Sequence, residues 1–351
     1  MQKVGRRSGA SCFACAVWLA SAIASAAAPP ARLERFEFTQ IQMGVPFKLT
    51  FYAEGRDVAN QAADAAFAHV THLNSLMSDY DPSSELSRLG GISVGKPARV
   101  SDPLWCVLVE AQRLARDTHG AFDITVGPYV RLWRRARRTR QLPSPERMQQ
   151  ARDAVGHELL ILDASSKTVR LARPNMRLDL GGIAAGYAVD EVLKLLRKRG
   201  INRALLDASG DIGASEPPPG KGDWRVAVAP LEADGPASCY IDLACAAVTT
   251  SGDAFQHVDI GGKRYSHIVD PRTGVALTDS ASATVYAPTC IVADSLATAA
   301  SVLGPEAGVA LVDRTPGAAS LFVCARGGRV ETIRSKRWDA KCRPSAPREK
   351  R

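Results

Sequence analysis

The sequence predicts a mixed α/β fold. Its 351 residues are 46% hydrophobic and 23% charged, which is the composition of an ordinary globular protein. Segments with apolar residues at helical spacing occur along the same chain as short runs in which apolar residues alternate or are β-branched. Once the two ends are set aside, roughly 300 residues remain, enough for one large domain or two smaller ones.

The first half of the chain opens on two strands and continues with helices. Apolar residues at helical spacing in 57–77 predict an amphipathic helix, and Gly120 ends the next one. In order, the expected elements are strands at 32–42 and 45–54, helices at 57–77 and 103–119, a strand-like run at 120–128, a helix at 145–154, and a hairpin of strands at 159–163 and 168–171.

The second half repeats a plan of strand, glycine turn and helix. Gly200 closes one expected helix and Gly304 closes another. In order, we expect a strand, glycine turn and helix across 177–198, strands at 204–208, 224–230 and 238–243, a strand ending in a polar turn at 247–253, a strand at 282–287, and a helix at 291–303.

The two ends read differently from the domain, which we expect at 32–333. Basic residues, an apolar segment at 12–23 that is short for a membrane span, and small residues at 25–28 predict a signal peptide at 1–28 and a periplasmic protein. An uncleaved anchor is the alternative, and Sec and Tat export both stay open. No later segment is apolar enough to cross a membrane. Residues 334–351 are basic and contain prolines, which predicts a disordered tail.

Cysteine usage indicates neither a zinc site nor a redox motif. Of eight cysteines, six remain after the signal peptide, and none of them forms a Cys-x-x-Cys pair. In an oxidising compartment some could form disulfides, but the sequence does not give the pairing.

Positive charge is unevenly distributed. The formal net charge of +9 is concentrated at the N-terminus, in an arginine run at 131–140 and in the tail. No zinc-finger, helix-turn-helix or RNA-binding signature accompanies these runs, so we expect no nucleic-acid partner. The arginine run predicts a solvated helix end and loop, with a docking patch for an acidic partner as the alternative.

The stretch 263–274 brings together an imidazole, a carboxylate and a guanidinium. His267, Asp270 and Arg272 lie around Pro271, which disfavours helix at the residue before it, and Gly274 permits a tight turn. A turn that presents these groups on a scaffold suits catalysis. In the alternative, Asp270 caps backbone amides on the surface and Arg272 is solvated.

Three other stretches have features of ligand sites. Asp123 stands among apolar neighbours, so it needs local amides or a ligand as a partner. Tyr80 in a polar loop suits stacking on a planar ligand, although a half-buried tyrosine is the simpler interpretation. The glycine turn at 181–182 could bring backbone amides to a phosphate, but close packing explains it equally well.

A possible metal site lies on the helix expected at 291–303. Asp294 and Thr298 are four residues apart and therefore share one face. With a main-chain carbonyl such as that of Ala297, they offer hard oxygen ligands of the type Mg²⁺ takes, with water and phosphate completing the shell. In the alternative, Asp294 is a first-turn acid favoured by the helix dipole and Thr298 belongs to the core.

Taken together, these stretches resemble the ApbE family of FAD:protein FMN transferases (flavin transferases). The resemblance covers about residues 36–325, in blocks that follow the family's order. The matching blocks are 43–44, 77–89, 120–128, 178–190, 209–212, 250–253, 267–274 and 293–298. The resemblance implies a single large catalytic domain of the ApbE-like, T-fold-related architecture.

The resemblance also implies an activity and a site. FMN would move from FAD to a Ser or Thr hydroxyl of a target protein, with release of AMP. The acceptor would be a flavoprotein subunit of a membrane-associated redox system. The implied FAD contacts are Met43, Tyr80, Ala121, Phe122, Asp123, Gly181 and Ile268. The implied Mg²⁺ ligands are Asp294, Thr298 and the carbonyls of Ala184 and Ala297. His267 and Asp270 fall near the reacting phosphate, and either could be the catalytic base.

Three positions depart from the family pattern. Ala185 stands where Lys or Glu is common, Gly90 replaces a usual Asn, and Val45 follows Met-Gly where Thr is frequent. These departures leave the expected metal ligands intact but affect the expectations for FAD affinity and target choice. The alternatives to a transferase are therefore an Mg²⁺-dependent FAD pyrophosphatase and a non-catalytic FAD-binding protein.

Overall fold

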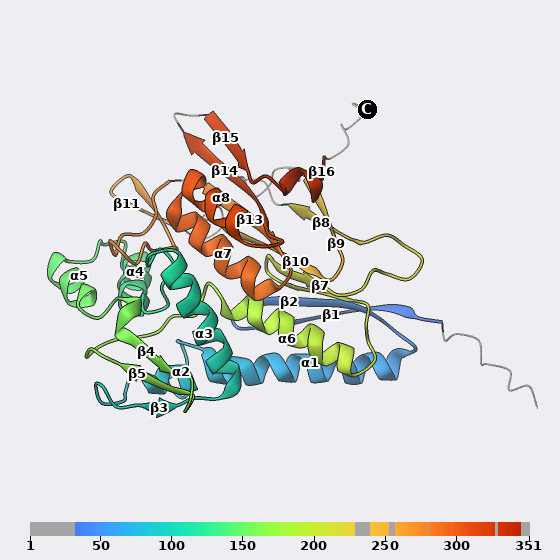
Figure 1. Cartoon of the computed structure of the whole chain (residues 1–351), viewed down its shortest axis with the longest axis horizontal. Helices are drawn as coiled ribbons and strands as arrows, with labels where there is room; N and C mark the ends of the chain where they lie inside the picture. Colours follow the sequence, from blue (N-terminus) through green and yellow to red (C-terminus); the bar gives the residue numbers. More distant parts are fainter. Residues whose placement is uncertain (1–31, 229–238, 253–256, 280, 327–328, 345–351) are drawn as a thin grey trace, which may run out of the picture. The chain divides into compact units, whose positions relative to one another are not determined.

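The computed structural model describes residues 32–228, 239–252, 257–279, 281–326 and 329–344 (Figure 1). The predicted signal peptide, residues 1–28, lies outside the described residues. The chain from Leu33 onward forms one structural unit.

An antiparallel sheet of eight strands forms the centre of this unit. The strand order is β1-β2-β6-β7-β10-β13-β14-β15, and each neighbouring pair is antiparallel. The strands are β1 (Glu34–Gln42), β2 (Val45–Ala53), β6 (Ala204–Ala208), β7 (Asp211–Ala214), β10 (Ala246–Gly252), β13 (Ala281–Ala287), β14 (Ala319–Arg326) and β15 (Arg329–Arg334).

Side chains alternate between two cores on the two faces of this sheet. Leu206 and Val285 belong to the larger core, whereas their neighbours Leu205 and Tyr286 pack against the smaller one. This alternation follows from the two-residue period of a strand. The sheet therefore supports a layer on each face.

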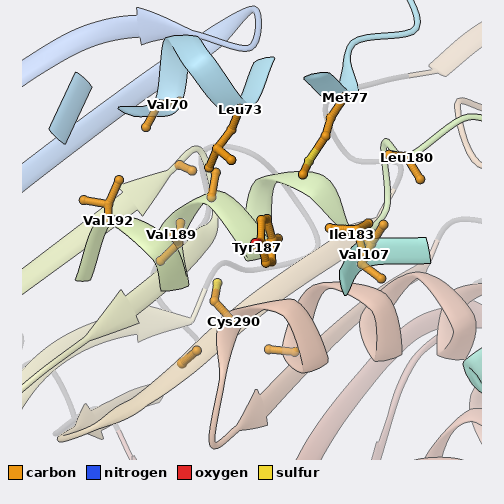
Figure 2. Packing of buried hydrophobic residues seen from close by; sticks show 14 of the residues in the cluster. Val70, Leu73, Met77, Val107, Leu180, Ile183, Tyr187, Val189, Val192 and Cys290 are labelled. Carbon is orange, nitrogen blue, oxygen red and sulfur yellow. The ribbon is translucent and has the colours of Figure 1, made fainter. Parts of the chain in front are cut away.

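Helices cover the face of the larger core. These helices are α1 (Arg56–Met77), α2 (Glu85–Leu89), α3 (Asp102–Asp117), α6 (Ala184–Lys198), α7 (Cys290–Leu303) and α8 (Pro305–Arg314). Helices α4 (Gly127–Thr139) and α5 (Pro145–Arg152) pack in a separate apolar cluster. Figure 2 shows α6 between α1 and α7, with Leu73 of α1, Val189 of α6 and Cys290 of α7 directed into the space between the helices. The predicted helices at 57–77, 103–119, 145–154 and 291–303 are confirmed as α1, α3, α5 and α7.

A small sheet covers the other face. It has the order β16-β9-β8 and consists of β8 (Trp224–Val228), β9 (Cys239–Leu243) and β16 (Cys342–Pro344). Two further small sheets lie outside these layers. They are formed by β3 (Ala98–Arg99), β5 (Thr168–Leu171) and β4 (Leu160–Asp163), and by β11 (His257–Ile260) and β12 (Lys263–Ser266).

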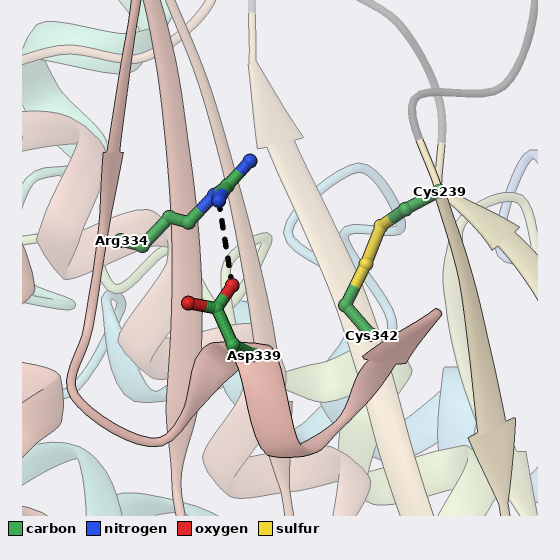
Figure 3. The surroundings of a disulfide bond; sticks show 4 residues. All are labelled: Cys239, Arg334, Asp339 and Cys342. Atoms are coloured by element: carbon green, nitrogen blue, oxygen red, sulfur yellow. Dashed lines mark hydrogen bonds and ion pairs between the residues drawn. A yellow bond between two sulfur atoms is a disulfide. The ribbon is translucent and has the colours of Figure 1, made fainter. Parts of the chain in front are cut away.

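The prediction of a disordered tail from residue 334 is wrong for residues up to 344. The short helix η2 (Trp338–Ala340) buries Trp338 to 1% exposure in the smaller core, and β16 pairs with β9. Figure 3 shows the disulfide that joins Cys342 to Cys239. The basic composition of this segment predicted disorder, although its one large apolar side chain, Trp338, anchors it to the core. Residues 345–351 lie outside the described residues.

Reduction of this disulfide should destabilise the protein. The bond closes a loop between cysteines 103 positions apart, and chain-entropy models give loops of that length about 5 kcal/mol. We expect a Cys342→Ser variant to unfold at a lower urea concentration than the oxidised parent. A Cys106→Ser variant, which removes an exposed free thiol, is the control. Equal unfolding midpoints for parent and Cys342→Ser would contradict the prediction.

The strand-like run expected at 120–128 is not a strand. Asp123 accepts hydrogen bonds from the backbone N–H and the hydroxyl of Thr125, both at 2.8 Å, which makes a local turn. Pro128 then lies in the first turn of α4. Only a single bridge, from Val126 to Arg177, pairs this segment with its neighbour. The turn formed by the Asp123 side chain therefore takes the place of the strand pairing that the apolar composition predicted.

Among the helices of the described ranges, none combines the length and the apolar character needed to span a bilayer.

Candidate active site

A cleft lies where several loops meet the first turn of α6 and one side of α7. Its first cavity has a volume of about 780 Å³. All of the residues expected to contact the flavin nucleotide line this cavity, namely Met43, Tyr80, Ala121, Phe122, Asp123, Gly181 and Ile268. Residues from distant parts of the chain therefore meet around one space large enough for a dinucleotide moiety.

A second cavity of about 670 Å³ adjoins the first. Tyr80, Gly181, His267 and Thr298 line both cavities. Ala184 and Asp294 line the second, together with Ala185. Thr298 and His267 thus lie at the junction of the two cavities, with Asp294 and Ala184 in the second.

Two of the expected site residues, Ala297 and Asp270, do not lie where the family resemblance implies. Ala297 is fully buried inside α7, and its carbonyl accepts a hydrogen bond from the Ser301 hydroxyl at 2.9 Å. Asp270 is not among the residues lining either cavity. Its side chain is instead engaged by Arg272.

The turn after β12 explains the position of Asp270. Its carboxylate accepts from the Arg272 backbone N–H, Nε and Nη2, each at 2.9 Å. The Asp270 carbonyl accepts from Gly274 N–H at 2.8 Å, and Gly274 has a φ of 77° that favours glycine. Asp270 therefore has the capping role given by the alternative interpretation, whereas His267, three residues earlier, faces the cleft.

Glycines let α6 and α7 approach closely at the second cavity. A Cβ on Gly186 would lie 2.5 Å from the Cys290 carbonyl oxygen and 2.8 Å from Asp294 Cβ. A Cβ on Gly182 would lie 2.8 Å from the Thr298 hydroxyl. Close packing therefore explains the glycine turn. The turn packs against helix α7 and not against a strand.

Two hydrogen-bond sets fix the position of α7. Asp190 of α6 accepts from the N–H groups of Cys290 and Ile291 at 2.8 and 2.9 Å, which satisfies unpaired amides at the start of α7. One turn further along, an Asp294 carboxylate oxygen accepts from Gly186 N–H at 3.0 Å. Each helix therefore holds the other in place, with Asp294 and Thr298 beside the start of α6.

Three carboxyl groups around this junction have raised pKa values. Removal from water raises the pKa of Asp294 well above its usual range, and the charge of Asp211 adds to it. Removal from water, followed by the charge of Asp207, raises the pKa of Asp211 to about 7. Burial also raises the pKa of Asp190. Negative charge is costly at this point of the molecule, so a cation would be favoured there.

The donor set fits Mg²⁺. Asp294 and Thr298 supply a carboxylate and a hydroxyl one turn apart, and Ala184 lines the same cavity. Mg²⁺ takes oxygen ligands, commonly one or two carboxylates with waters and substrate phosphate. Across the described ranges, no cluster of three His, Cys, Asp or Glu residues is arranged to hold a metal. Asp211, with its raised pKa, lines the same cavity, as do the carboxylates of Asp79 and Asp207.

The raised pKa values predict a pH-dependent stability in the presence of a chelator. The folded protein keeps Asp211 protonated up to about pH 7, whereas the unfolded chain releases this proton near the ordinary aspartate pKa of 3.8. The folded state therefore binds more protons between these values, and the free energy of unfolding should fall as pH rises through this interval, by on the order of 4 kcal/mol.

An Asp211→Asn variant, which stays neutral, should lack this part of the decline. The comparison uses urea unfolding at several pH values between 4 and 8, because titrations of groups that do not interact with Asp211 cancel between the two proteins. Parallel profiles for parent and variant would contradict the prediction.

Arg134 of α4 connects two segments that line the first cavity. It forms ion pairs with Asp79 and, at 2.9 Å, with Asp179, and its guanidinium lies 4.0 Å from the centre of the Tyr80 ring. Asp179 in turn accepts from Gly181 N–H at 2.9 Å. The loop that bears Tyr80 and the turn that bears Gly181 are thus held by one side chain.

Sequence reasoning missed Arg134, Asp179 and Asp211 as site residues. Asp79 and Asp179 are 55 and 45 positions from Arg134, so local patterns do not reveal this contact. Asp211 was visible as an acid in a glycine turn directly after a strand, which is a usable signal. Asp253, in the polar turn after β10, lies outside the described residues.

Comparisons with known proteins agree with this geometry. The FAD:protein FMN transferase of Haemophilus influenzae is 30% identical over 298 residues, covering 82% of this chain and 86% of that protein. The FAD:protein FMN transferase of Vibrio cholerae is 34% identical over 245 residues, covering 69% and 73%.

Solved structures show the same fold. The flavinyl transferase ApbE of Pseudomonas stutzeri, in its apo form, superposes with a TM-score of 0.78 at 30% identity, covering 88% of this chain and 97% of that one. The ApbE protein of Thermotoga maritima superposes with a TM-score of 0.79 at 27% identity, covering 88% and 100%. The sequence model of the ApbE family matches residues 43–322. This chain therefore belongs to the ApbE family.

Proposed function

We propose that this protein transfers FMN from FAD to a Ser or Thr hydroxyl of an acceptor protein and releases AMP. One observation carries the proposal: the expected flavin contacts, the Asp294–Thr298 pair and His267 line two adjoining cavities. The names of the curated relatives support FMN transfer from FAD. The enzyme is accordingly a transferase that uses FAD as its substrate.

The reaction requires positioning and charge neutralisation more than covalent help. The acceptor oxygen attacks the FMN-side phosphorus, the bond from that phosphorus to the bridging oxygen breaks, and the bridging oxygen leaves with AMP. Ala184 and Ala185 place the start of α6 beside the second cavity, where the positive end of the helix dipole suits phosphate oxygens. Mg²⁺ held by Asp294, Thr298 and the carbonyl of Ala184, which all line the second cavity, would supply charge neutralisation at the pyrophosphate.

His267 is our choice for the base that takes the hydroxyl proton. A base needs hydrogen-bond reach to the attacking group, and His267 lines both cavities. Asp270 instead holds Arg272 and the amide of the turn. We assign Asp270 the role of fixing the turn that presents His267.

Covalent flavin on an acceptor tests the function directly. The purified protein is incubated with FAD, Mg²⁺ and a candidate acceptor flavoprotein subunit, and flavin fluorescence is read on a denaturing gel. We expect a fluorescent acceptor band and one AMP per flavin transferred. FMN and AMP formed without an acceptor would select a FAD pyrophosphatase instead. FAD binding without turnover in either assay would select a flavin-binding protein.

We propose that the chain is exported and acts on an acceptor subunit of a membrane-associated redox system. The basic and apolar segments within residues 1–28 support export, and so does the Cys239–Cys342 disulfide, because disulfides persist in oxidising compartments. Intact-mass analysis of the exported product, with and without reductant, tests both points. A product that retains residues 1–28 and gains no mass on reduction would contradict them.

A further inference from the structure

The arginine run forms one face of a helix. Arg131, Arg134 and Arg138 of α4 are spaced three and four residues apart, so they lie on one side. On the opposite side, Tyr129 and Trp133 are buried, and Trp133 donates a hydrogen bond to the Gly274 carbonyl at 2.8 Å. The predicted solvated helix end is therefore a helix anchored by its aromatic side, with its arginines directed away from that anchor.

These arginines line a separate cavity of about 550 Å³. Four arginines contribute to its wall against one carboxylate, that of Asp79, which is ion-paired with Arg134. In the described ranges, Arg131, Arg138 and Arg177 form no ion pair with a carboxylate, and all three are exposed. Burial and the charge of Arg131 lower the pKa of Arg177, which indicates that like charges gather here.

The cavity adjoins the flavin cleft. Asp79, Tyr80 and Arg134 line both this cavity and the first cavity of the cleft. Tyr80 is 75% exposed at the boundary, beneath the Arg134 guanidinium. A chain seated among the arginines would therefore lie next to the nucleotide.

We propose that this cavity binds an acidic segment of the acceptor protein, next to the hydroxyl that reacts. The charged contacts come from Arg131, Arg138 and Arg177, together with Arg134. This inference rests on the proposed function, because a protein hydroxyl must enter the cleft for the transfer. Arginine forks match carboxylates in planar, bidentate pairs. Pro82, Leu86 and Leu178 add apolar lining to the concave wall, which suits peptide side chains more than a flat membrane surface.

A charge-neutral triple variant tests the proposal. In Arg131→Gln/Arg138→Gln/Arg177→Gln, the KM for the acceptor should rise about tenfold, because three exposed charge contacts are lost. The kcat and the Kd for FAD should stay close to those of the parent. The matched control, Arg135→Gln/Arg147→Gln/Arg152→Gln, removes three exposed arginines of α4 and α5 that do not line the cavity. It should behave as the parent.

A second measurement keeps this proposal separate from the proposed function. Anisotropy of a fluorescein-labelled glutamate-rich peptide should report binding to the parent and the control, and weaker binding to the cavity variant, even where no transfer is detected. Equal peptide binding by all three proteins, or an equal rise of KM in both triple variants, would overturn the proposal. So would a cavity variant that loses only binding to anionic lipid vesicles and retains the parent KM for the acceptor.

Discussion

Replacing Asp294 with asparagine should lower the rate of flavin transfer by about a hundredfold or more. Metal-ion stabilisation of phosphoryl charge supplies several kcal/mol, and each 1.4 kcal/mol corresponds to about a factor of ten. The asparagine keeps the size of the side chain and an oxygen that accepts from Gly186 N–H, a bond of 3.0 Å in the parent. The loss should therefore arise from weaker Mg²⁺ binding and not from collapse of the site.

The same substitution should raise the stability of the metal-free protein. Asp294 is 5% exposed, and removal from water raises the pKa of its carboxyl well above the usual range. A neutral amide avoids that cost, so urea unfolding in chelator at pH 8 should have a higher midpoint than in the parent.

Opposite changes in activity and stability distinguish a ligand from a structural carboxylate. Calorimetric titration with Mg²⁺ should show at least tenfold weaker binding by Asp294→Asn. The control is Asp64→Asn, which changes an exposed acid on α1 and should alter neither quantity. A variant with the parent's Mg²⁺ affinity and transfer rate would remove Asp294 from the proposed metal site.

The elements that were predictable from sequence are those whose signal is local. The helix at 57–77 became α1 (Arg56–Met77) because its apolar residues repeat with the helical period over many turns. The hairpin at 159–163 and 168–171 became β4 and β5 for a similar reason, since short apolar runs flank a polar turn. Such patterns need no knowledge of distant partners.

The errors came from features that depend on tertiary contacts. Nothing around Trp338 predicts that β8 and β9 provide a core for it. The run at 120–128 has strand composition, but the Asp123–Thr125 hydrogen bonds give the backbone a different partner. Composition alone therefore assigned disorder to one segment and a strand to the other.

The same distinction between local patterns and tertiary contacts applies to the candidate site. The family resemblance implied the flavin contacts, and these residues line one cavity. Sequence left His267 and Asp270 as equal candidates for the base because they are three residues apart. In the structure, Arg272 engages the Asp270 carboxylate through local hydrogen bonds, whereas His267 lines two cavities whose other walls come from distant parts of the chain, which the sequence does not reveal.

Replacing His267 with glutamine should lower kcat by about a hundredfold to ten-thousandfold, the range typical of a lost general base. The Kd for FAD should change little, because the flavin contacts in the first cavity come from many other residues. Glutamine retains hydrogen-bonding capacity but cannot accept the proton at neutral pH. Single-turnover flavin transfer at saturating acceptor isolates this step from acceptor binding.

The matched comparison is Asp270→Asn. Its ion pair with Arg272 lies on the surface side of the turn, where the arginine is 42% exposed, and such pairs contribute about 1 kcal/mol or less. The asparagine oxygen can still accept from the Arg272 N–H, so the turn should persist and kcat should fall by less than about tenfold. If Asp270→Asn lost as much kcat as His267→Gln while keeping the parent's unfolding midpoint, Asp270 would be the base. Added imidazole should restore part of the activity of a His267→Gly variant and none of that of Asp270→Asn, because only the first leaves room for a base in the cleft.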